Sequence, residues 1–275
     1  MGQARSVLWS YRSNSKSGGR NIKKLFGVLI TLVLTAVCTE TSGEIKHYQI
    51  QSKTGEGQNA LSVYLPEDYN TLDASYPVLY LLHGYGGNDL TFLGKGYGDQ
   101  AWMADANVSV IVDRLVQEGR IKPLIVACPD ITNIGLIDDL RDFISFVDAT
   151  FRTIANRSSR AIAGHSFGGY RSLRIALANP ELFGTVGGFS TSGTSLSVFA
   201  ELAKAYDQRS FPIRIWLYAG TNDQEGATQP NRDLATALKQ SGLPTEYIED
   251  DGDHINKVAK RLGEYIEYCA EYLKW

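Results

Sequence analysis

The distribution of apolar residues along the chain predicts a sheet whose strands are connected by helices. Segments 45–51 and 60–65 alternate apolar and polar residues on either side of a Gly-rich stretch at 54–57, as in an antiparallel pair at a sheet edge. Continuous apolar runs follow, and such runs are typical of strands buried on both faces. The predicted later strands are 77–82, 124–128, 160–163, 184–189 and 213–219, with an edge strand at 245–249.

Helical spacing of apolar residues fills the segments between these strands. In the first of them, Val108, Ile111, Val112 and Leu115 recur at the spacing of one helix face. The predicted helices are 108–117, 137–151, a helix that starts directly behind Ser166 and runs to Ala178, 196–207, 231–240 and 255–275. Alternating strands and helices predict an α/β protein with a mostly parallel sheet and helices on both faces, formed by one domain from residue 44 to 275.

The first 38 residues follow a different pattern. Residues 1–24 are polar and basic, and residues 25–38 are an uninterrupted apolar run, which is the order of a signal peptide. Ala36-Val37-Cys38 ends this run with small residues, so we expect cleavage after residue 38 and an exported (secreted or periplasmic) protein. The run is shorter than the roughly 20 residues of a membrane span. An uncleaved membrane anchor and a lipoprotein attached through Cys38 are the alternatives.

The charge distribution bears on the partners of the protein. The chain has 27 basic residues, six of them within residues 1–38, which leaves 21 basic against 30 acidic residues in the remainder. An acidic body argues against nucleic acid or an anionic membrane as a partner. The membrane is therefore expected as a partner only if the N-terminal segment stays uncleaved.

The cysteines do not have the spacing of a metal site or of a disulfide scaffold. Cys128 ends a predicted strand and Cys269 lies in the last predicted helix, so we expect both in the core. The sequence leaves open a disulfide between them.

The chemistry of the chain centres on residues 161–170, AIAGHSFGGY, which contain the G-x-S-x-G pattern of a nucleophile elbow. A short apolar strand runs into a sharp turn with Ser166 at its tip, and a helix follows at once. Glycine is needed at positions 164 and 168, where a Cβ would collide with the strand or the helix. The pattern predicts that Ser166 is a nucleophile.

A serine nucleophile needs an oriented base, and His254 is the best placed of the four histidines. His254 follows the last strand, and active sites in parallel sheets form at the carboxyl ends of strands. His47 is expected on the surface, and His83 is expected to fix the loop that it begins. His165 adjoins Ser166, so its side chain should point away from the serine hydroxyl.

The base in turn needs a carboxylate on its other ring nitrogen. Asp223 directly follows the strand 213–219 and is the first choice, with Glu225 as the alternative. Asp250, Asp251 and Asp253 adjoin His254 in sequence, but we expect them to cap the next helix or to face water.

An oxyanion hole requires two backbone N–H groups. We assign them to Phe167, which follows the nucleophile, and to Tyr85 in the Gly-rich loop 83–87, with Gly86 as the alternative. The segment 89–106 follows the same strand and holds three aromatic residues. We expect Tyr97 and Phe92 to line the acyl or alcohol site. Trp102 either lines that site or packs in the core.

These motifs, taken in order, resemble the putative-esterase branch of the α/β-hydrolases, which includes feruloyl and acetyl-xylan esterases, S-formylglutathione hydrolases and mycolyltransferases. The resemblance covers about residues 44–275 and lies in SVYLP (62–66), YPVLYLLHGYGG (76–87), IKPLIVACPD (121–130), AIAGHSFGGY (161–170), NPELF (179–183), GTND (220–223) and GDH (252–254). It implies an α/β-hydrolase fold, with Ser166, Asp223 and His254 as the triad and Tyr85 and Phe167 as oxyanion donors. Phe167 departs from the methionine usual in this family, which affects the shape of the pocket.

Motifs and resemblance together predict a serine carboxylic-ester hydrolase that works through an acyl-enzyme and needs no metal or cofactor. The expected substrate is a small-molecule or carbohydrate-linked ester, such as a feruloyl or acetyl-sugar ester. An acyltransferase of the same fold and a catalytically inactive binding protein are the alternatives.

Overall fold

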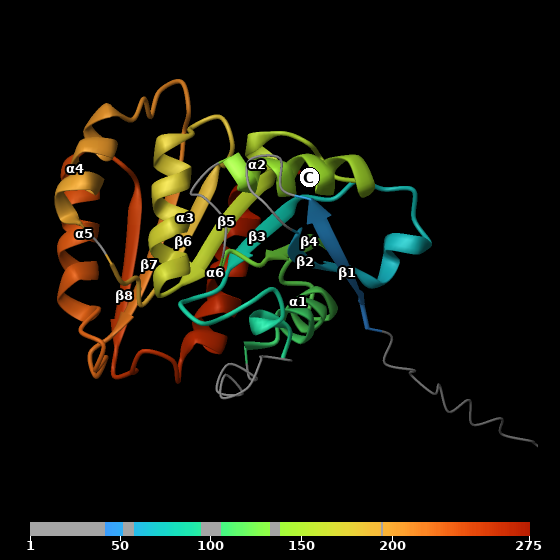
Figure 1. Cartoon of the computed structure of the whole chain (residues 1–275), viewed down its shortest axis with the longest axis horizontal. Helices are drawn as coiled ribbons and strands as arrows, with labels where there is room; N and C mark the ends of the chain where they lie inside the picture. The colour runs from blue at the N-terminus through green and yellow to red at the C-terminus, as the bar shows by residue number, and fades with distance from the viewer. Residues whose placement is uncertain (1–41, 52–57, 95–105, 133–137, 194) are drawn as a thin grey trace, which may run out of the picture. The chain divides into compact units, whose positions relative to one another are not determined.

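A single sheet of eight strands organises the computed structural model, in the order β1-β2-β4-β3-β5-β6-β7-β8 (Figure 1). Strand β2 pairs antiparallel with β1 and with β4, whereas all pairs from β4 to β8 are parallel. The structure describes residues 42–51, 58–94, 106–132, 138–193 and 195–275. The strands are β1 Glu44–Gln51, β2 Gln58–Leu65, β3 Val78–Leu82, β4 Ile125–Pro129, β5 Arg160–His165, β6 Thr185–Phe189, β7 Arg214–Gly220 and β8 Thr245–Asp250.

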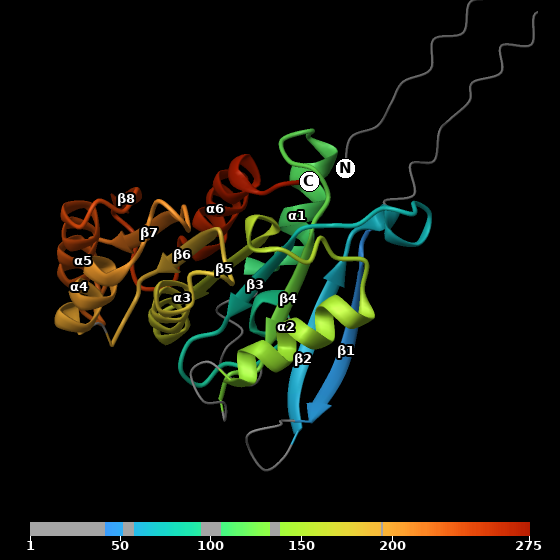
Figure 2. The same ribbon diagram turned by 90° about the horizontal axis from the view of Figure 1, so that it is seen from above.

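Helices cover both faces of the sheet (Figure 2). Helices α1 (Val108–Gln117) and α6 (Val258–Tyr272) contribute their buried residues to one hydrophobic cluster. The other face is covered by α2 Asp138–Thr150, α3 Phe167–Ala178, α4 Leu196–Ala205 and α5 Thr228–Gln240. Short 3-10 helices lie at Glu67–Asn70, Thr91–Leu93 and Arg157–Ser159.

Strand β3 shows why the central strands are apolar throughout. Tyr80 and Leu82 belong to the cluster under α2 to α5, whereas Leu79 and Leu81 belong to the cluster under α1 and α6. Successive side chains of a strand point to opposite faces, so a strand between two helical layers buries every residue. This arrangement confirms the predicted α/β architecture with helices on both faces.

Two predicted helix starts are wrong by three residues, and the predicted helices 196–207 and 255–275 end earlier, at Ala205 and Tyr272. Helix α5 begins at Thr228 rather than at Asn231, because Pro230 lies in the first turn, where no intrahelical N–H bond is lost. Helix α6 begins at Val258 rather than at Ile255. The Asp253 carboxylate accepts the backbone N–H groups of Ile255 and Asn256, both at 2.7 Å, and holds these residues in a turn before the helix.

The two cysteines of the body are free thiols. Cys128 and Cys269 are buried in the cluster under α1 and α6, as expected, and they form no disulfide. Burial raises the pKa of both thiols well above the usual range. Neither thiol therefore has the thiolate character of a reactive cysteine.

The predicted signal peptide, residues 1–38, lies outside the described residues and remains a prediction. All described residues fall within one unit, Glu40–Trp275. Within the part that the structure describes, no helix is long and apolar enough to cross a membrane.

Candidate active site

Ser166 lies in a strained turn between β5 and α3. Its backbone has φ 54° and ψ −119°, a conformation that non-glycine residues rarely adopt. The glycines on either side permit close approach: a Cβ on Gly164 would lie 2.4 Å from the backbone carbon of Gly168, and one on Gly168 would lie 2.2 Å from the carbonyl oxygen of Leu82. The local geometry therefore agrees with the elbow that the sequence predicts.

Hydrogen bonds to the end of strand β6 and to the loop after it hold Ser166 in place. Its backbone N–H donates to Phe189 O at 2.8 Å, and its carbonyl accepts the N–H of Ser192 at 3.2 Å. The Ser166 hydroxyl lies 2.9 Å from the Ser192 hydroxyl, and no hydrogen bond joins it to the imidazole of His254, which is likewise described. In this resting arrangement the serine hydroxyl is thus bonded to another hydroxyl rather than to the predicted base.

His254 and Asp223 form a close pair. The His254 Nδ1 lies 2.8 Å from Asp223 Oδ2, and the Asp223 side chain is fully buried. The second oxygen, Asp223 Oδ1, accepts the backbone N–H of Glu225 at 2.9 Å. Such a pair fixes the tautomer with the proton on Nδ1 and leaves Nε2 free to act as a base. Glu225, the alternative acid, has its side chain in solvent.

Backbone hydrogen bonds tie the loops that carry this pair. Thr221 N donates to Asp250 O at 2.7 Å, and Asn222 N donates to Gly252 O at 2.9 Å. Gly220 is required at this junction, because a Cβ there would lie 2.0 Å from Gly252 O. The parallel pairing of β7 and β8 therefore continues into the loops and brings Asp223 to His254.

His165 has a contact that sequence reasoning missed. Its side chain does not hydrogen-bond the Ser166 hydroxyl, as expected, but its Nε2 donates to the backbone oxygen of His254 at 2.8 Å. The two imidazole rings meet edge to face with centroids 4.8 Å apart. Burial, together with the neighbouring charge of His254, lowers the pKa of His165 to about 4, so His165 is neutral at pH 7.

The loop after β3 runs against the nucleophile. A Cβ on Gly84 would lie 3.3 Å from Ser166 Cβ, and Gly87 N donates to Gly84 O at 3.1 Å to close a turn around Tyr85. The Tyr85 side chain is 92% exposed. Phe167 is the first residue of α3, so its N–H has no intrahelical acceptor. The two predicted oxyanion donors thus come from segments that meet at Ser166.

His83 anchors this loop to the segment that follows strand β4. Its buried ring accepts the N–H of Ile131 through Nε2 at 2.9 Å and donates from Nδ1 to Gly84 O at 2.7 Å. Both ring nitrogens are therefore used within the protein. This geometry agrees with the structural role that the sequence suggests for His83.

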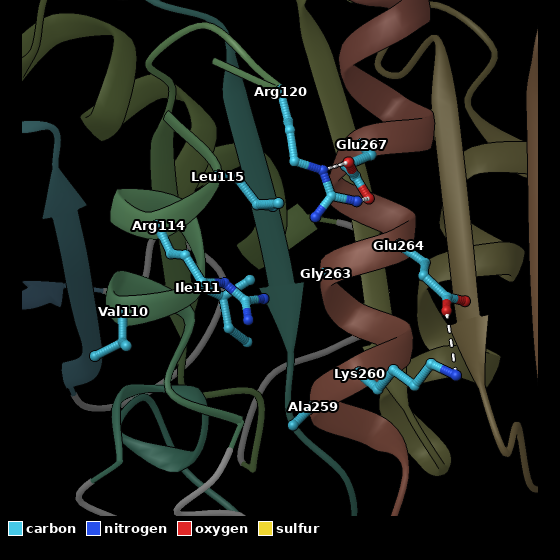
Figure 3. Close-up of a pocket in the computed structure, with 10 residues that line it drawn as sticks. All are labelled: Val110, Ile111, Arg114, Leu115, Arg120, Ala259, Lys260, Gly263, Glu264 and Glu267. Carbon is cyan, nitrogen blue, oxygen red and sulfur yellow. Dashed lines mark hydrogen bonds and ion pairs between the residues drawn. The ribbon is translucent and has the colours of Figure 1, made fainter. Parts of the chain in front are cut away.

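A cavity of about 290 Å³ opens beside the predicted oxyanion donors. Its lining consists of His83, Gly84, Tyr85, Gly86, Ile131, Thr132, Phe167 and Arg171. A larger hollow of about 420 Å³ lies between α1 and α6 (Figure 3). Its charged side chains include the ion pairs Arg120–Glu267 and Lys260–Glu264, and its lining contains no candidate nucleophile. The smaller cavity is therefore the candidate substrate site.

The sequence predicts that three aromatic residues, Phe92, Tyr97 and Trp102, line the substrate site or lie near it. Phe92 is 1% exposed and packs in the core with residues of α1, so the prediction that it lines the substrate site is wrong. An aromatic ring so completely buried contacts other side chains rather than a ligand. Tyr97 and Trp102 lie outside the described residues. Among the described residues, no cluster of potential metal ligands occurs.

Comparison with known proteins finds a matching family model and curated relatives. A family model described as "Putative esterase" matches residues 52–134 and 138–257. An endo-1,4-beta-xylanase/feruloyl esterase of Xylanibacter ruminicola is 31% identical over 236 residues, which cover 76% of this chain and 29% of that protein. The chain spans 29% and 30% of the length of the first two curated relatives that it matches.

Solved structures share the fold. A ferulic acid esterase superposes with a TM-score of 0.70 at 21% identity, over 85% of this chain and 100% of that chain. A second ferulic acid esterase, from Anaeromyces mucronatus and in complex with ferulic acid, has a TM-score of 0.64 at 21% identity, over 82% of this chain and 90% of that chain. The likeness confirms the predicted α/β-hydrolase fold.

Proposed function

Because the chain belongs to the esterase family, we propose that it is a carboxylic-ester hydrolase that acts through Ser166, His254 and Asp223. The observation that carries this proposal is the pair of His254 Nδ1 and Asp223 Oδ2, which lie 2.8 Å apart. The backbone of His254 is in turn hydrogen-bonded to His165, the residue before Ser166. Histidine oriented by a carboxylate is the base that serine needs at neutral pH.

In the proposed reaction, Ser166 Oγ attacks the ester carbonyl while His254 Nε2 takes the hydroxyl proton. The carbonyl oxygen becomes an oxyanion, which the N–H groups of Tyr85 and Phe167 stabilise. Collapse of the tetrahedral intermediate expels the alcohol, which takes the proton from His254 and leaves an acyl-Ser166 ester. Water then attacks this ester with the same base, the acid is released, and Ser166 regains its proton.

The Ser166 hydroxyl must direct its proton to His254 Nε2, rather than to the Ser192 hydroxyl, before this cycle begins. The net free energy of one such hydrogen bond is about 0.5–1.5 kcal/mol, so the rearrangement is a small part of the barrier.

The substrates that we propose are small carboxylic esters, including esters linked to carbohydrates. The names of the relatives support this class, since they include a feruloyl esterase and an acetyl esterase of Caldicellulosiruptor saccharolyticus. The small cavity beside the oxyanion loop is consistent with an acyl group of limited size.

The test is a panel of p-nitrophenyl, acetyl-sugar and feruloyl esters, measured with the wild type, Ser166→Ala, His254→Ala and the double variant. Each single variant is expected to lose roughly 10³- to 10⁶-fold in turnover, with little further loss in the double variant, because the residues act as one unit. Additive losses, or activity that survives in Ser166→Ala, would contradict the proposal. Product analysis with an added alcohol separates hydrolysis from acyl transfer.

A further inference from the structure

The geometry points to Arg171 as a specificity residue: we propose that the cavity beside Ser166 binds an acyl group carrying a carboxylate, and that Arg171 recognises this carboxylate. The inference rests on the proposed ester hydrolysis and names its substrate class more closely. Three features of Arg171 support it, namely its position, its lack of a counter-ion and the chemistry of the cavity around it.

Two contacts fix the Arg171 head group in the cavity wall. Arg171 lies on α3, one turn after Phe167, and its Nη1 donates to Ile131 O at 2.6 Å. The guanidinium lies 4.8 Å from the centroid of the Phe167 ring, within the range of a cation–π contact. Arg171, Ile131 and Phe167 all line the cavity, so the positive charge is preorganised there.

The charge of Arg171 has no acidic partner among the described residues. Arg160 and Arg261, which are more deeply buried, are paired with Asp148 and with Asp250 and Glu264. Arg152 and Arg157 have no carboxylate partner but donate three or more hydrogen bonds each to backbone oxygens. Arg171 instead uses one N–H on a neutral carbonyl, and its buried Nε has no hydrogen-bond partner. Burial lowers the pKa of Arg171 from its usual value, a penalty that a bound anion would offset. An arginine kept without a counter-ion at a cavity is suited to bind a carboxylate.

The acyl part of the ester, rather than the alcohol, fits this cavity. The leaving alcohol must lie near His254, which protonates it, and His254 does not line the cavity. The predicted oxyanion donors do line it, and the carbonyl that they would hold carries the acyl chain. The walls supplied by Ile131 and Phe167 suit the methylene groups between the carbonyl and a terminal carboxylate.

The experiment compares esters that share one leaving group and differ only in acyl charge. The p-nitrophenyl ester of butyric acid is compared with the p-nitrophenyl monoesters of succinic, glutaric and adipic acid. Substitution of Arg171 by Met should lower kcat/KM for the best charged ester by roughly 10- to 100-fold, the effect of a charge-assisted hydrogen bond. The ratio of kcat/KM for the charged ester to kcat/KM for the butyrate ester should fall by the same factor, and Arg171→Lys should retain part of the preference.

Arg174→Met is the matched control, because Arg174 lies on the same helix and donates to the Tyr170 hydroxyl but does not line the cavity. It should leave the ratio of charged to neutral ester unchanged. The wild type offers a test that needs no variant: about 0.5 M NaCl should reduce kcat/KM for the charged ester more than for butyrate.

Two failures are distinguishable. If the wild type hydrolyses butyrate but the charged-to-neutral ratio is the same in Arg171→Met and insensitive to salt, the role of Arg171 is refuted while ester hydrolysis stands. If the wild type hydrolyses none of the esters, the proposed function itself fails.

Discussion

The backbone oxygen of His254 accepts a hydrogen bond of 2.8 Å from Nε2 of His165, the residue that precedes the elbow serine. The same imidazole packs edge to face against the His254 ring. The loop that carries the proposed base is therefore attached to the strand that carries the proposed nucleophile. His165 is a positioning residue in this arrangement, since it acts on the reaction through His254.

His165→Ala should lower kcat more than it raises KM, because misplacing a catalytic group by about 1 Å can cost roughly 100-fold in rate. We expect a loss of about 10- to 100-fold in kcat with p-nitrophenyl acetate. His165→Gln keeps an N–H donor and should recover part of the loss. A purely structural residue would instead lower the melting temperature and leave the kcat of the folded fraction unchanged.

The buried His165 should also make the protein less stable in mild acid. The pKa of His165 is about 4 in the folded protein against an ordinary 6.5, so below pH 6.5 the unfolded chain binds a proton that the folded protein does not. Stability should therefore fall between pH 6.5 and 4, by about 2 kcal/mol at pH 5. Urea unfolding at pH 7.5 and pH 5 measures this loss.

His165→Gln is the comparison that isolates this effect, because the other titrating groups are common to both proteins. The variant should lose less stability between the two pH values than the wild type. Equal losses in both proteins would show that His165 titrates normally.

Asp223→Asn should lower turnover by roughly 100-fold or more at neutral pH, because an amide donor facing Nδ1 favours the wrong tautomer of His254. Glu225→Gln is the matched control, since Glu225 supplies only its backbone N–H to Asp223 and that group is unchanged. Measuring kcat of both variants with the same ester shows which of the two residues is the acid of the triad. A larger loss in Glu225→Gln would make Glu225 the acid.

Ser192→Ala should make Ser166 react faster, because the resting hydrogen bond between the two hydroxyls is removed. The expected gain in the rate of fluorophosphonate labelling is about 2- to 10-fold, which corresponds to one net hydrogen bond. Ser195→Ala serves as the control, since Ser195 lies in the same loop as Ser192 but its hydroxyl bonds the Ser197 hydroxyl in the first turn of α4. Slower labelling of Ser192→Ala would mean that Ser192 assists the nucleophile.

Much of the fold followed from the sequence because burial leaves a strong periodic signal. Strand β3 and helix α1 lie where their apolar residues predict them, since a strand between two layers and an amphipathic helix have distinct patterns. The start of α6 was less predictable. The Asp253 side chain accepts the backbone N–H of Ile255 and stabilises a turn there in place of the first helical turn. Such a side-chain hydrogen bond hardly changes the spacing of apolar residues from which the helix is predicted.

The candidate site was only partly predictable for a related reason. Ser166, Asp223 and His254 each lie within four residues after the end of a strand, and strand ends can be read from the chain. The contacts of His165, Ser192 and Arg171 depend on which loops meet in space, and no spacing along the chain encodes that. The prediction for Phe92 failed because an aromatic residue in a Gly-rich loop has the same local sequence whether it packs in the core or lines a pocket.

The site of a covalent adduct identifies the nucleophile of this protein directly. The wild type is treated with a fluorophosphonate probe, digested and mapped by mass spectrometry, with Ser166→Ala and His254→Ala treated in parallel. We expect one adduct on the peptide that contains Ser166 and no adduct in Ser166→Ala. Labelling of His254→Ala should be slowed by about 100-fold or more, because the serine has lost its base. An adduct on another residue, or equal labelling of wild type and Ser166→Ala, would contradict the role of Ser166 as the nucleophile.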